Sequence, residues 1–226
     1  MIVCFDFDDV ICDGNPLYKI GKDFPDKFSE LVDIVEFLES NKNPKKFYSV
    51  IKKIIALGKG ITFSDVENIV LSFNLMEGVE ETFSELKKRG YKIVIISADD
   101  KNIIENFMKK HDLMKYVDHI YASRLGVVNG ELDGTITGDV IETEKTGIVD
   151  VLEELYEIEL KDIFYIGDGL TDLPILKIVE KGVLFCPNML TQAEIFTDDE
   201  LKKKIDCKNL FIVEKKDLRE VLKFID

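Results

Sequence analysis

The sequence predicts an α/β protein whose core is a doubly wound parallel sheet, with a helical bundle inserted after the first strand. Short apolar runs alternate with amphipathic stretches over most of the chain, which is the pattern of βαβ units. Residues 14–77 break this alternation and show helical periodicity throughout. Their charge also differs: this segment holds nine lysines and nine acidic residues and is neutral, whereas the whole chain carries −14.

The predicted strands are rich in β-branched and aromatic residues and are bounded by turn residues. They cover residues 2–7, 91–97, 163–166 and 183–185. Helical spacing between them covers residues 77–89, 100–111, 144–156 and 171–181. Residues 120–137 contain Asn129-Gly130 between two alternating segments, and this dipeptide predicts a β-hairpin.

The inserted segment is expected to form a small helical domain. Helical periodicity covers residues 28–38, 44–57 and 63–73, with no convincing strand. We therefore predict two domains, a core made of residues 1–13 and 78–226 and a helical cap made of residues 14–77.

Composition limits the function classes. The charge of −14, from 44 acidic against 30 basic residues, argues against nucleic acid or an anionic membrane as a partner. Four cysteines without CxxC spacing, in an acidic chain with no signal peptide, predict a cytoplasmic protein with reduced thiols. No apolar stretch approaches the length of a membrane span. The oligomeric state stays open.

Two aspartates follow the first predicted strand directly. Asp6 and Asp8 end the run that begins at Ile2. Adjacent carboxylates at the end of a buried strand raise each other's pKa, and proteins keep that arrangement when a cation neutralises it or when one carboxylate does chemistry. The alternative is a pair of solvated acids that cap the next turn.

Polar residues also follow the other strands. Ser97 ends the second strand, Asp168 and Asp172 follow the strand at 163–166, and Lys145 begins the helix after the hairpin. Ligands bind outside the carboxyl ends of strands in such a sheet, so these side chains are expected to converge. Taken singly, each has an alternative: a turn serine, a solvated lysine, or an aspartate that caps a helix.

In this order, the motifs resemble the haloacid dehalogenase superfamily, and within it the phosphoserine phosphatase-like branch. The segments that carry the resemblance are Asp6-Phe7-Asp8-Asp9-Val10, Ser97, Lys145 and Gly167-Asp168-Gly169-Leu170-Thr171-Asp172. The resemblance covers nearly the whole predicted core, and the helical insertion lies where that family has its cap. It implies the Rossmann-like core of that superfamily.

The resemblance implies a phosphatase that hydrolyses a small phosphorylated metabolite through an aspartyl-phosphate. Asp6 would be the nucleophile, and Asp8 would protonate the leaving oxygen and then activate water. Ser97 would hydrogen-bond a phosphoryl oxygen, and Lys145 would neutralise charge on the phosphate and on Asp6.

The same resemblance implies Mg²⁺ as the cofactor. Asp6, Asp168 and the backbone carbonyl of Asp8 would be its protein ligands, since Mg²⁺ prefers oxygen ligands and keeps several waters. Asp172 would either bind the metal or orient a metal-bound water.

Several departures separate the chain from phosphoserine phosphatases. Glycines follow the motif serine in that branch, whereas Ala98-Asp99-Asp100 stands here, and we interpret both acids as caps of the next helix. No arginine precedes Arg89, so the predicted cap has none to bind an amino acid head group. Phosphoserine is therefore not implied as the substrate. The candidate substrate contacts in the insertion are Asn15, Tyr18, Lys19, Lys52 and Lys53.

Other functions remain open at this point. Transfer of the phosphoryl group to an alcohol, as in a phosphotransferase or phosphomutase, uses the same intermediate. A non-catalytic binding protein can keep the fold and the metal site, although every group needed for catalysis is present. Dehalogenation is disfavoured, because Asp8 has no obvious role in halide displacement.

Overall fold

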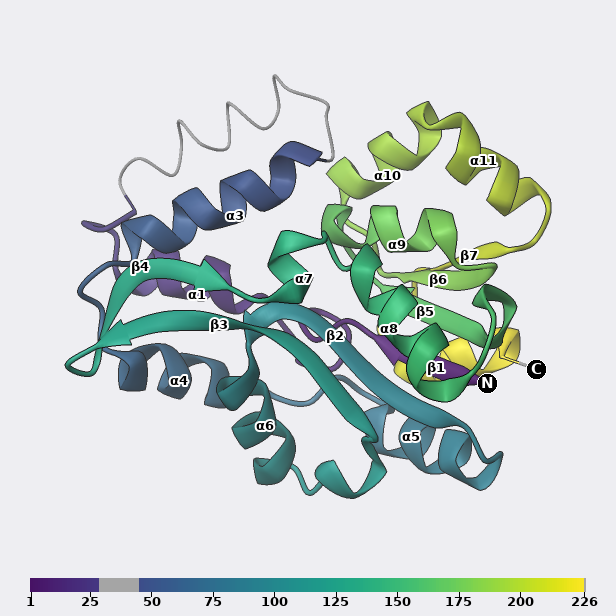
Figure 1. The fold of residues 1–226 in the computed structure, drawn as a ribbon, viewed down its shortest axis with the longest axis horizontal. Helices are drawn as coiled ribbons and strands as arrows, with labels where there is room; N and C mark the ends of the chain where they lie inside the picture. The colour runs from purple at the N-terminus through teal and green to yellow at the C-terminus, as the bar shows by residue number, and fades with distance from the viewer. Residues whose placement is uncertain (29–44, 226) are drawn as a thin grey trace.

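The computed structural model describes residues 1–28 and 45–225. These residues form a central seven-stranded sheet with helices around it (Figure 1). Its strands are β1 (Ile2–Phe5), β2 (Lys92–Asp100), β3 (His119–Val128), β4 (Glu131–Thr137), β5 (Ile163–Gly167), β6 (Lys181–Phe185) and β7 (Leu210–Val213). They lie in the order β4-β3-β2-β1-β5-β6-β7. Every neighbouring pair is parallel except β3 and β4, which form an antiparallel hairpin.

Helices cover both faces of this sheet. The α-helices of the core are α5 (Val79–Lys88), α6 (Lys101–Lys110), α7 (Asp139–Glu142), α8 (Thr146–Tyr156), α9 (Leu173–Ile178), α10 (Met189–Thr197) and α11 (Asp199–Asp206). Its 3₁₀ helices are η1 (Met114–Tyr116), η2 (Leu160–Asp162), η3 (Leu170–Asp172) and η4 (Leu218–Phe224).

Side chains alternate between the two faces along each strand, and this alternation builds two cores. Val3 and Phe5 of β1 pack with α5, α6 and η4 on one face. Ile2 and Cys4 pack with α8, α9 and α11 on the other face. Burial on both faces explains why the parallel strands are continuous apolar runs. The predicted fold class, a doubly wound mostly parallel sheet, is confirmed.

Local predictions hold for most of the core. Each predicted strand is present, and Asn129 and Gly130 have φ of 52° and 85°, as the two-residue turn of a hairpin requires. The predicted helix over residues 171–181 is wrong in its extent. A 3₁₀ turn occupies residues 170–172, α9 ends at Ile178, and β6 begins at Lys181. Strand β7 was not predicted.

The insertion contributes α1 (Pro16–Asp23), α3 (Lys45–Leu57) and α4 (Phe63–Leu71). The last two match predicted helices, whereas α1 was not predicted. Its start has a clear local cause, because the Asn15 side chain accepts a hydrogen bond from the Tyr18 N–H and Pro16 stands at the first helical position. The helix predicted over residues 28–38 lies outside the described residues, apart from Phe28.

The inserted helices pack on the core, α3 against β4 and α4 against α6. The assignment of residues 14–77 to a separate domain stays a prediction. Among the helices of the described part, none combines the length and the apolar character that a membrane crossing requires.

Candidate active site

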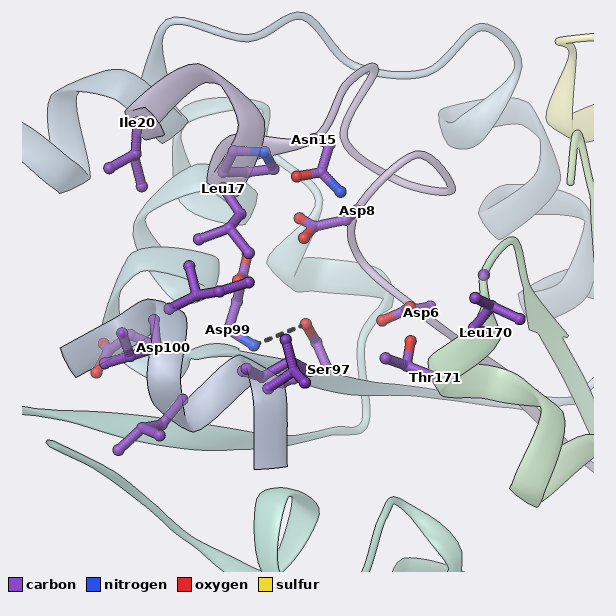
Figure 2. A pocket seen from close by; sticks show the side chains of 18 of the residues that line it. Asp6, Asp8, Asn15, Leu17, Ile20, Ser97, Asp99, Asp100, Leu170 and Thr171 are labelled. Carbon is purple, nitrogen blue, oxygen red and sulfur yellow. Dashed lines mark hydrogen bonds between the residues drawn. The ribbon is translucent and has the colours of Figure 1, made fainter. Parts of the chain in front are cut away.

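A cavity of about 490 Å³ lies over the carboxyl ends of β1, β2 and β5. Its walls also include residues of α1, α3, α4 and α10, so the insertion covers the edge of the sheet where the sequence predicted a site. Figure 2 shows Asp6, Asp8, Ser97 and Thr171 facing a common space, which Leu17 and Ile20 approach from α1.

Asp6 is fixed at the end of β1 by both its backbone and its side chain. Its N–H donates to the Ile166 carbonyl at 2.9 Å, which continues the pairing of β1 with β5. Its Oδ1 accepts from the Phe7 N–H at 2.8 Å, and its Oδ2 lies 2.8 Å from Lys145 Nζ. Burial and the nearby Asp172 carboxylate raise the pKa of Asp6 to about 7, although the Lys145 ammonium lowers it.

Lys145 is a buried cation at the centre of the site, with 1% of its surface exposed. Its Nζ lies 2.6 Å from Asp172 Oδ1, 2.8 Å from Asp6 Oδ2 and 3.2 Å from the Tyr165 hydroxyl. Burial lowers the pKa of this ammonium, but the Asp172 and Asp6 carboxylates outweigh burial and raise it. The alternative of a solvated lysine is therefore wrong.

The backbone at Lys145 is also unusual. Lys145 and the preceding Glu144 have φ of 66° and 55°, a left-handed conformation that costs free energy in residues other than glycine. It turns the chain from α7 into α8 so that the Lys145 side chain enters the site.

Asp172 holds this part of the site together. Its Oδ2 accepts from the N–H groups of Asp168 and Gly169, each at 3.0 Å. Its Oδ1 accepts from Lys145 and from the Tyr165 hydroxyl, each at 2.6 Å. These four bonds use the lone-pair positions of a carboxylate. Asp172 thus orients its neighbours, and a metal bound to it would share an oxygen that already accepts hydrogen bonds.

Gly167 allows Asp172 to come this close to the sheet. A Cβ at residue 167 would lie 2.3 Å from Asp172 Cγ, which is shorter than any tolerated contact. The glycine at the end of β5 is therefore required for the position of the Asp172 carboxylate.

Asp6, Asp168 and Asp172 form the acidic cluster of the site. One carboxylate oxygen from each lies within 4.8 Å of the others. Burial, together with the charges of Asp172 and Asp6, raises the pKa of Asp168 well above its usual range. A divalent cation offsets such repulsion, and carboxylate oxygens are the ligands of hard cations. The residues present therefore fit a divalent metal.

Asp8 lies beside a residue that the sequence did not mark for this site. Its carboxyl group lies near that of Asp99, and Asp8 Oδ1 and Asp99 Oδ2 are both buried without a hydrogen-bond partner among the described residues. Burial and the charge of Asp99 raise the pKa of Asp8 well above its usual range. A carboxyl group whose pKa is raised keeps its proton to higher pH, so these surroundings favour a protonated Asp8.

The interpretation of Asp99 as a helix cap is corrected by its position. Asp100 alone caps α6, with its Oδ1 accepting from the N–H groups of Asn102 and Ile103. Asp99 instead lines the cavity, and its N–H donates to Ser97 Oγ at 3.1 Å (Figure 2). Ser97 is buried beside it in β2, where the pairing with β3 becomes irregular.

The candidate substrate contacts separate into two groups. Asn15 lines the cavity, but Tyr18, Lys19, Lys52 and Lys53 do not. Tyr18 is 74% exposed, and Lys19 pairs with Asp23 at 3.6 Å on the outer side of α1. The two lysines of α3 are exposed, because the apolar face of that helix points to the cavity. The charge of a lysine suggested a contact with phosphate, but it does not show on which side of the helix the residue lies.

Two tyrosines were also missed. The Tyr48 hydroxyl donates to the Thr171 carbonyl at 3.0 Å and thus ties α3 of the insertion to the loop after β5. Tyr165 is fully buried, and its hydroxyl contacts Asp172. A tyrosine within the apolar run before Gly167 was a signal for a buried polar partner. The sequence held no such signal for Tyr48.

Comparison with known proteins gives consistent similarities. The sequence profile of haloacid dehalogenase-like hydrolases matches residues 44–177, which is more than half of the chain. The phosphoserine phosphatase of Methanocaldococcus jannaschii is 29% identical over 227 residues, which cover 99% of this chain and 97% of the relative. That of Wolinella succinogenes is 28% identical over 221 residues, which cover 98% of each chain.

Solved structures agree with these sequence similarities. A substrate-bound phosphoserine phosphatase complex superimposes with a TM-score of 0.77 and 25% identity, covering 100% of this chain and 98% of the other. A phospho-aspartyl intermediate analogue of phosphoserine phosphatase has a TM-score of 0.76, with the same identity of 25% and coverage of 100% and 98%.

Proposed function

Because the chain is a phosphatase of the haloacid dehalogenase-like hydrolase family, in its phosphoserine phosphatase-like branch, we propose that it hydrolyses a small phosphorylated metabolite through a phosphorylated Asp6, with Mg²⁺ as cofactor. The observation that carries this proposal is the buried group around Asp6. A nucleophile at the end of β1, a cation 2.8 Å away and an acid with a raised pKa at Asp8 are the parts that the reaction needs.

In the first step, Asp6 attacks the phosphorus and the bond from phosphorus to the leaving oxygen breaks. Asp8 gives its proton to that oxygen, so the alcohol leaves neutral. The raised pKa of Asp8 supports this role, because the acid must still hold its proton when substrate binds. Ser97 donates a hydrogen bond to a phosphoryl oxygen, and Lys145 fixes Asp6.

In the second step, Asp8 takes a proton from water as the water attacks the phosphorus. The bond to Asp6 breaks, phosphate leaves, and Asp6 and Asp8 return to their first states. Asp6, Asp168 and the Asp8 backbone carbonyl would hold Mg²⁺, which would supply positive charge near the transferring group. Asp172 keeps Lys145 and the loop at residues 168–169 in place.

The test is phosphate release from a panel of phosphorylated amino acids, sugars and nucleotides with Mg²⁺ present. Asp6→Asn should lower any activity by about a thousandfold or more, because it removes the nucleophile. Asp9→Asn is the matched control: Asp9 is the neighbouring acid with φ of 50°, a conformation that asparagine accepts, and activity should persist. Absence of phosphate release from the whole panel contradicts the proposal, and a phosphorylated alcohol among the products indicates transfer instead.

The proposal includes a cytoplasmic location and a cap formed by residues 14–77. The four cysteines are free, and Cys4 and Cys12 are buried, which supports a reducing compartment. The cavity walls contributed by α1, α3 and α4 support the cap.

A further inference from the structure

The cavity has one polar end and a long apolar remainder. Its polar end is the group at the ends of β1, β2 and β5. Away from this end, the walls come from helices of the insertion and from β4. They include Leu17, Ile20, Val50, Ile54, Leu132 and Ile136. A phosphoryl group bound at Asp6 therefore directs the rest of its molecule into an apolar space.

Positive charge is scarce on these walls. Of the described lining residues, Lys145 alone is cationic. Its three N–H donors already meet Asp6, Asp172 and Tyr165. A carboxylate on the leaving group would thus enter the cavity without a partner, and burying an unpaired charge is costly.

The acids of the described lining are Asp6, Asp8, Asp99, Asp100 and Asp168, which belong to the strand ends, and Glu194 on α10. Both oxygens of Asp100 are in use, by N–H groups of α6 and by the Leu125 N–H. Asp99 lies at the polar end, and its Oδ2 is buried without a hydrogen-bond partner among the described residues. An ammonium group could pair with Asp99 or with the partly exposed Glu194, but it would find no carboxylate on the described walls that the insertion and β4 supply.

Because the described walls that the insertion and β4 supply carry no charged side chain, we infer that the substrate is a phosphate monoester of an apolar alcohol. This inference rests on the proposed phosphatase function and narrows it to one class of leaving group. The volume of about 490 Å³ has room for such a group beside the phosphate, since ligand pockets commonly span roughly 300–1,000 Å³. Each methylene buried contributes up to about fourfold in affinity.

The test is kcat/KM with Mg²⁺ for ethyl, butyl, hexyl and octyl phosphate below their micelle concentrations, with O-phosphoserine and phosphocholine as charged comparisons. We expect kcat/KM to rise by about two- to fourfold per methylene until the cavity is full, and to exceed both charged esters. A flat or falling series, or a charged ester as the best substrate, overturns the inference.

Acetyl phosphate separates this inference from the function on which it rests. Acetate is a good leaving group, so the rate with acetyl phosphate depends mainly on the reaction at Asp6 and little on contacts with the apolar walls. If hydrolysis of acetyl phosphate does not depend on Asp6, the proposed function fails. If it does depend on Asp6 while the alkyl series is flat, only the leaving-group inference fails.

A charge placed on the apolar wall provides a second check. In Leu17→Lys, the ratio of kcat/KM for hexyl phosphate to that for acetyl phosphate should fall about tenfold or more. Leu155→Lys makes the same substitution on α8, at a side chain that is 51% exposed, and should leave the ratio unchanged. Leu17→Ala should lower the ratio less but in the same direction, and it covers the case in which the lysine variant does not fold. An unchanged ratio in folded Leu17→Lys contradicts the inference.

Discussion

Individual aspartates of the site differ in chemistry because their neighbours differ. Asp6 lies against the Lys145 ammonium, which lowers its pKa, although burial and Asp172 keep that pKa near 7. Burial and the charge of the nearby Asp99 raise the pKa of Asp8 well above its usual range. The site thus separates a nucleophile, which must be ionised, from an acid, which must hold a proton.

Asp99→Asn should move the alkaline limb of the pH profile of kcat/KM to lower pH. A carboxyl group with a raised pKa stays protonated to higher pH, and burial and the charge of Asp99 raise the pKa of Asp8. Replacing Asp99 by a neutral amide removes the repulsion, so Asp8 loses its proton at lower pH.

The measurement is the initial rate of phosphate release across the pH range at low substrate concentration. Asp9→Asn serves as the control, because Asp9 is not among the charges that raise the pKa of Asp8. A limb that stays in place in Asp99→Asn contradicts the role of Asp99.

Residues that follow strands could be predicted, because the carboxyl ends of parallel strands meet at one edge. Asp6, Asp8, Ser97, Lys145 and the loop after β5 do meet there. The neighbour of Asp8 could not be predicted in this way. Asp99 and Asp100 are adjacent and chemically identical, and only the exact path of the chain from β2 into α6 decides which of them caps the helix.

At the scale of whole elements, a hydrogen bond links the insertion to η3, the 3₁₀ turn that follows β5. It runs from the Tyr48 hydroxyl on α3 to the Thr171 carbonyl in η3. Tyr48 is buried with only 3% of its surface exposed, so water cannot readily replace its hydroxyl. The bond holds α3 over the edge of the sheet.

Tyr48→Phe should lower the free energy of unfolding by about 0.5–1.5 kcal/mol, because it leaves the Thr171 carbonyl without this donor. We also expect KM to rise more than kcat falls, since α3 supplies a wall of the cavity. Urea unfolding and steady-state kinetics measure these effects. Tyr18→Phe is the control, at a side chain that is 74% exposed. If Tyr48→Phe and Tyr18→Phe have equal effects, the hydrogen bond from Tyr48 to Thr171 does not hold α3 in place.

Element predictions succeeded where a pattern was long and failed where a local interaction set the boundary. The strands and most core helices follow from apolar periodicity. Helix α1 depends instead on Asn15 and Pro16, because eight residues are too few for a clear period. The helix predicted to reach residue 181 stops at Ile178, since the chain must extend to place Lys181 beside Phe164 of β5.

For the whole molecule, the charge of Asp168 opposes folding unless a metal cation is bound beside it. Asp168 has a pKa raised by burial and by its acidic neighbours. The folded state therefore prefers the protonated form. The cost of ionising it grows as pH rises from the unfolded pKa, near about 4, through the raised folded pKa.

Asp168→Asn should consequently melt at a higher temperature than the wild type in EDTA at neutral pH. It should also lose most of the increase that Mg²⁺ gives the wild type. In a chain of this size, about 1 kcal/mol corresponds to about 2–4 °C. Thermal unfolding with and without Mg²⁺ measures both effects. Asp150→Asn, on the exposed side of α8, makes the same chemical change and should alter neither. A lower melting temperature of Asp168→Asn in EDTA contradicts the prediction.

The position of β1 between β2 and β5 affects how the chain can fold while it is being synthesised. Asp6 and Asp8 are synthesised before Lys145 and Asp172, which follow more than a hundred residues later. In the folded protein, Lys145 contacts both Asp172 and Asp6. Until β5 is made, one edge of β1 has no partner and the two early acids stay in water, where like charges repel only weakly. We expect Asp6 to become buried only after Lys145 has been made, because the ammonium group then offsets the charge of the carboxylate.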